Sequence, residues 1–190
     1  TLFRSRFRFS WKKPYTLTLL STQMFPGIAF LIPYFMLFML IKKYIGIPMK
    51  DTYWGMILTY STFALPFSVL MLRNFLDTIP VEIDQQAMID GCSRPQIVFR
   101  IILPLALPGI ASVGIFSFIM AWNEILFATV LTGRNTRTVS LGLMEYITAQ
   151  QANWGGMMAA CILVSIPVLI FFTLLQKQIV SGLVQGATKG

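Results

Sequence analysis

Long apolar segments alternate with short polar stretches along this 190-residue chain. Four of these segments approach or exceed the ~20 apolar residues that an α-helix needs to cross the hydrocarbon core of a bilayer. They are residues 16–41, 54–72, 105–131 and 157–175, and the one charged residue within them is Glu124. The pattern predicts an all-α fold, a polytopic membrane helix bundle, with the chain forming a single transmembrane domain over residues 1–190.

Proline occurs in each of the four apolar segments. Inside a helix in water a proline costs about 3 kcal/mol, but in a membrane bundle neighbouring helices and Ser or Thr side chains satisfy the freed carbonyls. A proline in every segment favours kinked helices around a pathway, as in a transporter, over a simple anchor; irregular helix packing is the alternative. The residues are Pro26, Pro33, Pro66, Pro108 and Pro167.

A polar insert, residues 77–104, separates the second and third apolar segments. Thr78 is suited to cap a first short helix, because Glu82 and Asp84 follow it and complement the positive end of the helix dipole. Gly91 is suited to end that helix, since glycine readily adopts a left-handed backbone. The insert is therefore predicted to begin with one short helix that stops at this glycine.

A second short helix is predicted directly afterwards, because Ser93 and Gln96 have the spacing of a capping box. Apolar residues fall on one face of each helix. They are Ile83, Ala87 and Met88 in the first helix, and Ile97, Val98 and Ile101 in the second. We expect a cytoplasmic helix-turn-helix whose two helices lie nearly at a right angle; a loop resting on lipid headgroups is the alternative.

The composition argues against several kinds of chemistry. The chain is 56% hydrophobic and only 12% charged, whereas about a quarter of the residues of a soluble domain are charged. It contains no histidine, the commonest general base and metal ligand. Cys92 and Cys161 form no CxxC pair, so neither a zinc site nor a disulfide framework is indicated.

The net charge of +8 is the signature of basic loops beside a membrane rather than of a nucleic-acid surface. Lys and Arg concentrate on the cytoplasmic side of membrane proteins, which predicts a cytoplasmic N-terminus, insert and tail and outward loops at 42–53 and 132–156. The cytoplasmic set is Arg4, Arg6, Arg8, Lys12, Lys13, Arg73, Arg94, Arg100, Lys177 and Lys189, and the outer set is Lys42, Lys43, Lys50, Arg134 and Arg137.

Several motifs together resemble a known family. The insert and the segment after it resemble the EAA loop of binding-protein-dependent ABC importer permeases at Ala87, Asp90, Gly91, Phe99, Ile102, Leu103, Pro104 and Pro108. The stretches "FSFIMAWNEILFATVL" and "TVSLGL" resemble the carbohydrate-importer branch, and the tail "QIVSGLVQGATKG" resembles the end of MalG-like subunits. The resemblance covers essentially the whole chain.

Two departures from the family pattern stand out. Where the family has Glu-Ala-Ala, this chain has Gln85, Gln86 and Ala87, which leaves Asp84 or Glu82 as candidates for the missing acid. The family has six spans and four are visible here, so the resemblance implies that two N-terminal spans precede this sequence.

The resemblance implies the membrane-spanning permease subunit of an ATP-driven sugar importer in the cytoplasmic (inner) membrane of a prokaryote. Implied partners are a sister permease, two ATPase subunits that bind ATP and Mg²⁺, an external solute-binding protein and a sugar; this chain itself binds no cofactor or metal. The implied ATPase-coupling residues are Glu82, Ile83, Asp84, Gln85, Gln86, Ala87, Met88, Asp90 and Gly91. Alternatives are import of a glycerol phosphate or polyol, a membrane-embedded enzyme, or a scaffold.

Two further sets of residues are candidates for the transport pathway. An ionisable group inside a span is costly and usually functional, so Asn123 and Glu124 are expected to face the pathway or the sister subunit; an inter-helix hydrogen bond that holds the bundle together is the alternative. The outer loop 132–156 is expected to contact the binding protein or, less directly, the sugar, unless it is a solvated connector. Its candidates are Gln150, Gln151, Asn153 and Trp154.

Overall fold

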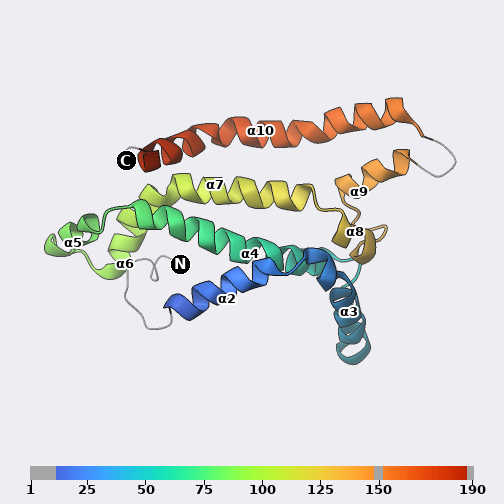
Figure 1. The fold of residues 1–190 in the computed structure, drawn as a ribbon, viewed down its shortest axis with the longest axis horizontal. Coiled ribbons are helices and arrows are strands. Elements are labelled where there is room, and N and C mark those ends of the chain that lie inside the picture. The colour runs from blue at the N-terminus through green and yellow to red at the C-terminus, as the bar shows by residue number, and fades with distance from the viewer. Residues whose placement is uncertain (1–11, 148–151, 188–190) are drawn as a thin grey trace. The chain divides into compact units, whose positions relative to one another are not determined.

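A computed structural model describes residues 12–147 and 152–187 of the chain (Figure 1). Within these ranges the regular elements are helices, and the one β-type pairing is an isolated bridge between Ile147 and Ala152. Four helical segments are long and apolar enough to cross a membrane: Gly27–Ile45, Tyr53–Thr78, Arg94–Trp122 and Trp154–Leu174. The predicted all-α fold class is confirmed.

The first predicted span, residues 16–41, is not one helix, which corrects the prediction from the sequence. Helix α2 (Lys12–Met24) ends before Pro26, and the chain restarts as η1 (Gly27–Phe30) and α3 (Leu31–Ile45). Pro26 has an extended backbone, with φ −64° and ψ 127°, and a proline also disfavours a helical backbone in the residue before it. The hydropathy of this uncharged segment does not reveal the break, because hydropathy does not depend on backbone conformation.

The third predicted span, residues 105–131, is also divided. Helix α7 (Leu103–Trp122) stops before a short break, and α8 (Leu126–Leu131) follows it. At its other end α7 continues without interruption from α6 (Arg94–Gln96) and η2 (Ile97–Ile102). The second and fourth spans are longer than predicted: α4 covers Tyr53–Thr78 and α10 covers Trp154–Ala187.

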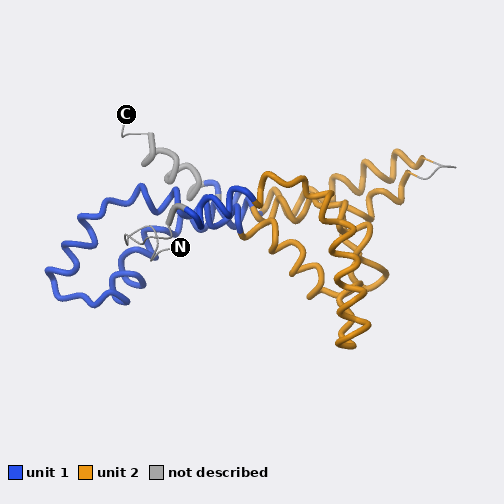
Figure 2. The backbone as a smooth tube through the Cα atoms, turned by 60° about the horizontal axis from the view of Figure 1, so that its bottom comes forward, with its two compact units in different colours: residues 1–21, 66–116, 171–190 blue, residues 22–65, 117–170 orange. Residues whose placement is uncertain are grey.

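The chain divides into two compact units, which are coloured separately in Figure 2. Unit 1 consists of residues 1–21, 66–116 and 171–190, and its core joins the insert to the end of α4 and the start of α7. The buried members of this core are Leu76, Ile79, Ala87, Ile97, Ile102 and Ala106. Next to it, Gly109 lies so close to Phe75 that an added Cβ would stand 2.4 Å from the ring, so glycine permits tight packing of α4 on α7.

Unit 2 consists of residues 22–65 and 117–170, and α3, α4 and α8 form its core. The buried residues are Phe38, Met56, Phe127, Ala128 and Leu131. Phe127 contacts two rings of the neighbouring helices, Tyr34 at 6.0 Å and Phe63 at 4.9 Å between ring centroids. Such aromatic pairs contribute about 0.5–1.5 kcal/mol each beyond the area that they bury.

Asp51 ties together two loops of unit 2 that are distant in the sequence. Its backbone N–H donates to the Leu131 carbonyl at 2.8 Å. Its carboxylate accepts hydrogen bonds from the Thr136 hydroxyl at 2.8 Å, the Thr136 N–H at 3.2 Å and the Asn135 amide at 3.2 Å. The Thr136 hydroxyl, with further backbone donors, holds the pKa of Asp51 below its ordinary value. Because Asp51 and Thr136 are 85 positions apart, no local sequence pattern predicts this contact.

We predict that Asp51→Asn lowers the thermal unfolding midpoint at neutral pH. A carboxyl with a depressed folded-state pKa stabilises the fold above the ordinary pKa of ~3.8, and the contribution disappears as pH falls through the lower folded-state pKa. The midpoints of wild type and variant should therefore differ at pH 7, begin to converge as pH falls below about 3.8, and coincide once pH lies below the folded-state pKa. Thr136→Val should behave like Asp51→Asn, and a difference that persists unchanged at low pH would contradict the assignment.

Candidate functional site

The polar insert begins later than the sequence suggested. Helix α4 runs to Thr78, whose hydroxyl donates to the Phe75 carbonyl at 2.7 Å, so the predicted role of Thr78 as a helix cap is wrong. The first insert helix, α5, covers Glu82–Ile89 with Val81 at its N-cap position. Glu82 and Asp84 lie in its first turn, as expected, because acidic side chains complement the positive end of the helix dipole.

The end of α5 has the predicted left-handed glycine. Gly91 has a φ of +81°, its N–H donates to the Met88 carbonyl at 3.1 Å, and the Cys92 N–H donates to the Ala87 carbonyl at 3.0 Å. These two bonds form a Schellman motif, which satisfies the last carbonyls of a helix and requires a left-handed residue at this position. The joint between the two insert helices therefore depends on Gly91.

The second insert helix also begins as predicted, with Ser93 and Gln96 in a capping box. The Ser93 N–H donates to the Gln96 side-chain oxygen at 2.7 Å. The helix is not a separate element, however, because it continues through η2 into α7. The second insert helix and the start of a candidate membrane span are thus one continuous helical segment.

The apolar residues of α5 lie in two different surroundings: two pack against the core of unit 1 and two are exposed. Ala87 is 5% exposed, and Ile83 is partly buried against the same core. Met88 is 50% exposed and Ile89 is 83% exposed. The polar residues exposed beside them are Glu82, Gln85, Gln86 and Asp90.

Glu124 lies in the break between α7 and α8, within unit 2. One carboxylate oxygen accepts a hydrogen bond from the Phe127 N–H at 2.8 Å; the other accepts from the Ala128 N–H and from the Tyr60 hydroxyl of α4, both at 3.1 Å. The inter-helix hydrogen bond that was the alternative interpretation is therefore present. Glu124 also lines a cavity of about 200 Å³ with Tyr60, Phe63, Ser117 and other residues.

Asn123 does not share the surroundings of Glu124. Its side-chain amide donates to the carbonyl of Ile119, in the last turn of α7, at 3.0 Å. It lines a different cavity, of about 390 Å³, together with Ser140, Met144 and other residues. The structure thus separates two neighbours that the sequence analysis grouped together.

The outer loop predicted at 132–156 is partly helical, with α9 (Val139–Leu143), η3 (Met144–Tyr146) and the first residues of α10. Asn153 serves as the cap of α10, since its side-chain oxygen accepts from the Gly156 N–H at 2.9 Å. Trp154 is 59% exposed. Gln150 and Gln151 lie outside the described residues.

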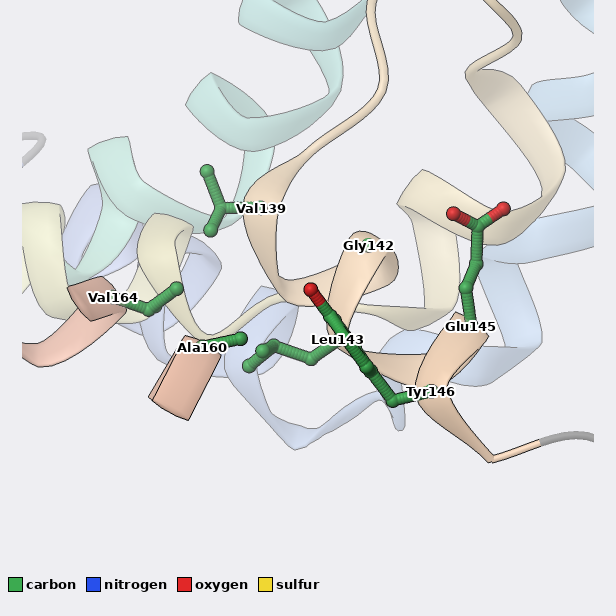
Figure 3. A pocket seen from close by; sticks show the side chains of 7 residues that line it. All are labelled: Val139, Gly142, Leu143, Glu145, Tyr146, Ala160 and Val164. Atoms are coloured by element: carbon green, nitrogen blue, oxygen red, sulfur yellow. The ribbon is translucent and has the colours of Figure 1, made fainter. Parts of the chain in front are cut away.

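A cavity of about 480 Å³ lies beside α9 and α10 within unit 2 (Figure 3). In the view shown, the Tyr146 hydroxyl points toward the side of Val139, whereas the Glu145 carboxylate lies on the other side of Tyr146 from Val139. Glu145 forms an ion pair with Arg137. The cavity is lined by Val139, Gly142, Leu143, Glu145, Tyr146, Ala160 and Val164.

Comparison with known proteins places these features in context. Residues 2–185 match the family described as binding-protein-dependent transport system inner membrane component. The inner membrane ABC transporter permease protein YcjP of Escherichia coli (strain K12) is 38% identical over 187 residues, which are 98% of this chain and 65% of that protein.

The names of two further relatives include sugars. The diacetylchitobiose uptake system permease protein DasC of Streptomyces coelicolor is 37% identical over 98% of this chain and 66% of its own length. The trehalose/maltose transport system permease protein MalG of Thermococcus litoralis is also 37% identical, again over 98% of this chain and 66% of its own. This chain therefore spans slightly less than two thirds of the length of these relatives.

The fold also matches a solved structure, the crystal structure of a bacterial ABC transporter involved in the import of the acidic polysaccharide alginate. The TM-score is 0.68 and the sequence identity is 21%, over 93% of this chain and 65% of that chain. At this identity the likeness concerns the fold alone.

We predict that Tyr60→Phe lowers the stability of the chain less than Glu124→Ala does. Tyr60→Phe removes one hydrogen bond to a charged group, worth about 1.5–3 kcal/mol, and leaves Glu124 its two backbone donors. Glu124→Ala leaves those two donors and the Tyr60 hydroxyl without their acceptor. Thermal unfolding in lipid nanodiscs measures both, with Tyr34→Phe as a control that removes a tyrosine bond to Thr62 instead. Equal losses for Tyr60→Phe and Glu124→Ala would contradict the assignment.

Proposed function

The chain belongs to the family of binding-protein-dependent transport system inner membrane components, and we propose that it forms half of the translocation pathway of an ATP-driven sugar importer. Family membership makes it a multi-pass inner-membrane transport protein rather than an enzyme. The proposal of a sugar as the solute is supported by the names of relatives for diacetylchitobiose and for trehalose and maltose. A glycerol phosphate or polyol is the alternative solute.

In this proposal the chain performs no ATP hydrolysis itself. A sister permease completes the pathway, two ATPase subunits bind ATP and Mg²⁺ on the cytoplasmic side, and an external binding protein delivers the solute. The N-terminus, the insert and the tail then face the cytoplasm, in keeping with the excess of Lys and Arg in those segments. The family description itself supports the dependence on a binding protein.

The exposed face of α5 is the observation that carries the coupling role. The core of unit 1 contacts α5 on one side through Ile83 and Ala87, while Met88 and Ile89 are exposed on a helix whose other exposed residues are polar. Exposed apolar residues rimmed by polar ones mark protein interaction sites. We infer that this face seats on the ATPase subunit and that Gly91 fixes the angle at which its motion reaches α7.

Gln85 lies where the family has a glutamate. Since glutamine carries no charge, this position cannot form an ion pair with the ATPase in the proposed interface. Docking should therefore depend mainly on apolar packing and hydrogen bonds, and only modestly on salt, because dissolved ions screen charges rather than apolar contacts. The outer segment of unit 2, residues 132–156, is proposed to meet the binding protein, with Trp154 as its most exposed described aromatic residue.

We predict that Gly91→Val uncouples ATP hydrolysis from transport or releases the ATPase, while the protein still inserts. A β-branched residue at a φ of +81° is strained by roughly 1–2 kcal/mol, and the strain falls on the joint between α5 and α7. Gly46→Val is the matched control, since Gly46 has a φ of +82° and, like Gly91, open space around an added Cβ.

The measurements are co-purification of the ATPase and the ratio of ATP hydrolysed to sugar transported in proteoliposomes, with maltose, trehalose and diacetylchitobiose as probes. Gly46→Val should lose similar stability but keep the wild-type ratio, and Gln85→Ala should cost less than Gly91→Val. Transport by Gly91→Val at the wild-type rate with the ATPase bound would show that the insert has no coupling role.

A further inference from the structure

The helix that joins the insert to the membrane is wound differently over one turn. The segment η2 (Ile97–Ile102) is a π-helix between α6 and α7. At its start the Ile97 N–H donates four residues back, to Ser93, at 3.0 Å; at its end the Leu103 N–H donates five residues back, to Val98. The turn therefore holds one more residue than an α-helix would, a feature that is rare and frequently found at functional sites.

The extra residue decides which side chains face the core of unit 1. Ile97, Ile102 and Ala106 are all at most 6% exposed and belong to that core. Ile102 and Ala106 have the four-residue spacing of an α-helix, but Ile97 and Ile102 are five residues apart, which in an α-helix would place them about 140° apart. The π turn is what allows both isoleucines to point the same way.

The sequence also allows an α-helical form of this turn, in which a different isoleucine faces the core. Ile101 is identical to Ile102, lies four residues after Ile97 and already packs against the core as a partly buried residue. If Ile97 stays in place and the turn tightens, Ile101 takes the position of Ile102, so the core loses no isoleucine. Both windings thus bury the same kind of side chain at this level.

Tightening of this turn into an α-helix costs no backbone hydrogen bond at Pro104. Pro104 has no N–H, so it bonds neither the Phe99 carbonyl, five residues back, nor the Arg100 carbonyl, four residues back. A donor at this position would favour one winding over the other. Its absence leaves the end of the π turn free to shift by one residue.

We propose that η2 is a register switch, in which the π turn becomes α-helical and turns α7 about its axis relative to α5. One residue of register corresponds to about 100° of rotation and 1.5 Å of rise in an α-helix, shared between the turn and α7. Leu105, now 45% exposed, would then replace the smaller Ala106 against the core. Since a well-packed core resists extra methylene groups, α7 would move away from α4. The inference rests on the proposed coupling role of the insert.

The test uses the full transporter in membranes, with Cys92 and Cys161 replaced by Ala, and a maleimide as the probe. Ile102→Cys, at a site that is 2% exposed, should label slowly without nucleotide and at least ten times faster with a non-hydrolysable ATP analogue. Ile101→Cys should show the opposite change. In the same chain with Val98 deleted, Ile97 lies four positions before Ile102 in an unbroken α-helix, so the analogue should alter neither labelling rate.

Val98→Ala is the matched control, because it removes the same side chain but keeps the residue count, and it should respond as the wild type does. Continued protection of Ile102→Cys with the analogue while the ATPase co-purifies would overturn the register switch and leave the coupling proposal intact. An identical response after deletion of Val98 would overturn it as well. Failure of the ATPase to co-purify with the wild-type chain would instead reject the proposed function, and the switch with it.

Discussion

The backbone's need for hydrogen-bond partners in an apolar medium governs this structure. Inside a bilayer each N–H and C=O must be satisfied within the protein, so the long apolar segments among the described residues are mainly helical, and each break in them needs a substitute partner. At the break after α7, the carboxylate of Glu124 accepts hydrogen bonds from the backbone N–H groups of Phe127 and Ala128. At the break after α2, the Ala29 N–H donates a hydrogen bond to the Pro26 carbonyl at 2.9 Å.

The insert also satisfies the backbone groups at the ends of its two helices. The Schellman motif at Gly91 and the capping box at Ser93 satisfy the facing ends of its two helices. Ala87 and Ile97 then join both helices to one core with the end of α4. In the proposed coupling role, a force on the exposed side of α5 would act on the start of α7 through this core, and the π turn η2 lies between the two.

Much of the fold could be predicted from the sequence, because length and apolarity specify spans, and Gly91, Ser93 and Gln96 carry local signals that depend on few neighbours. Other features involve contacts between distant residues, which no local pattern encodes. At the break after α7, Tyr60 donates a hydrogen bond to Glu124, 64 positions later in the sequence. Asp51 is similarly joined to Thr136, 85 positions away. The first break, in contrast, has a local signal, because Pro26 disfavours a helical backbone in the residue before it.

The most direct test of the coupling account is site-specific photo-crosslinking in membranes that contain the complete transporter. A crosslinking residue at Ile89, which is 83% exposed, should form a covalent adduct with the ATPase subunit, and its yield should change when an ATP analogue binds. The same residue at Trp154, also exposed but in the outer segment, should form no adduct with the ATPase. An adduct from position 154, or none from position 89 while the ATPase co-purifies, would contradict the account.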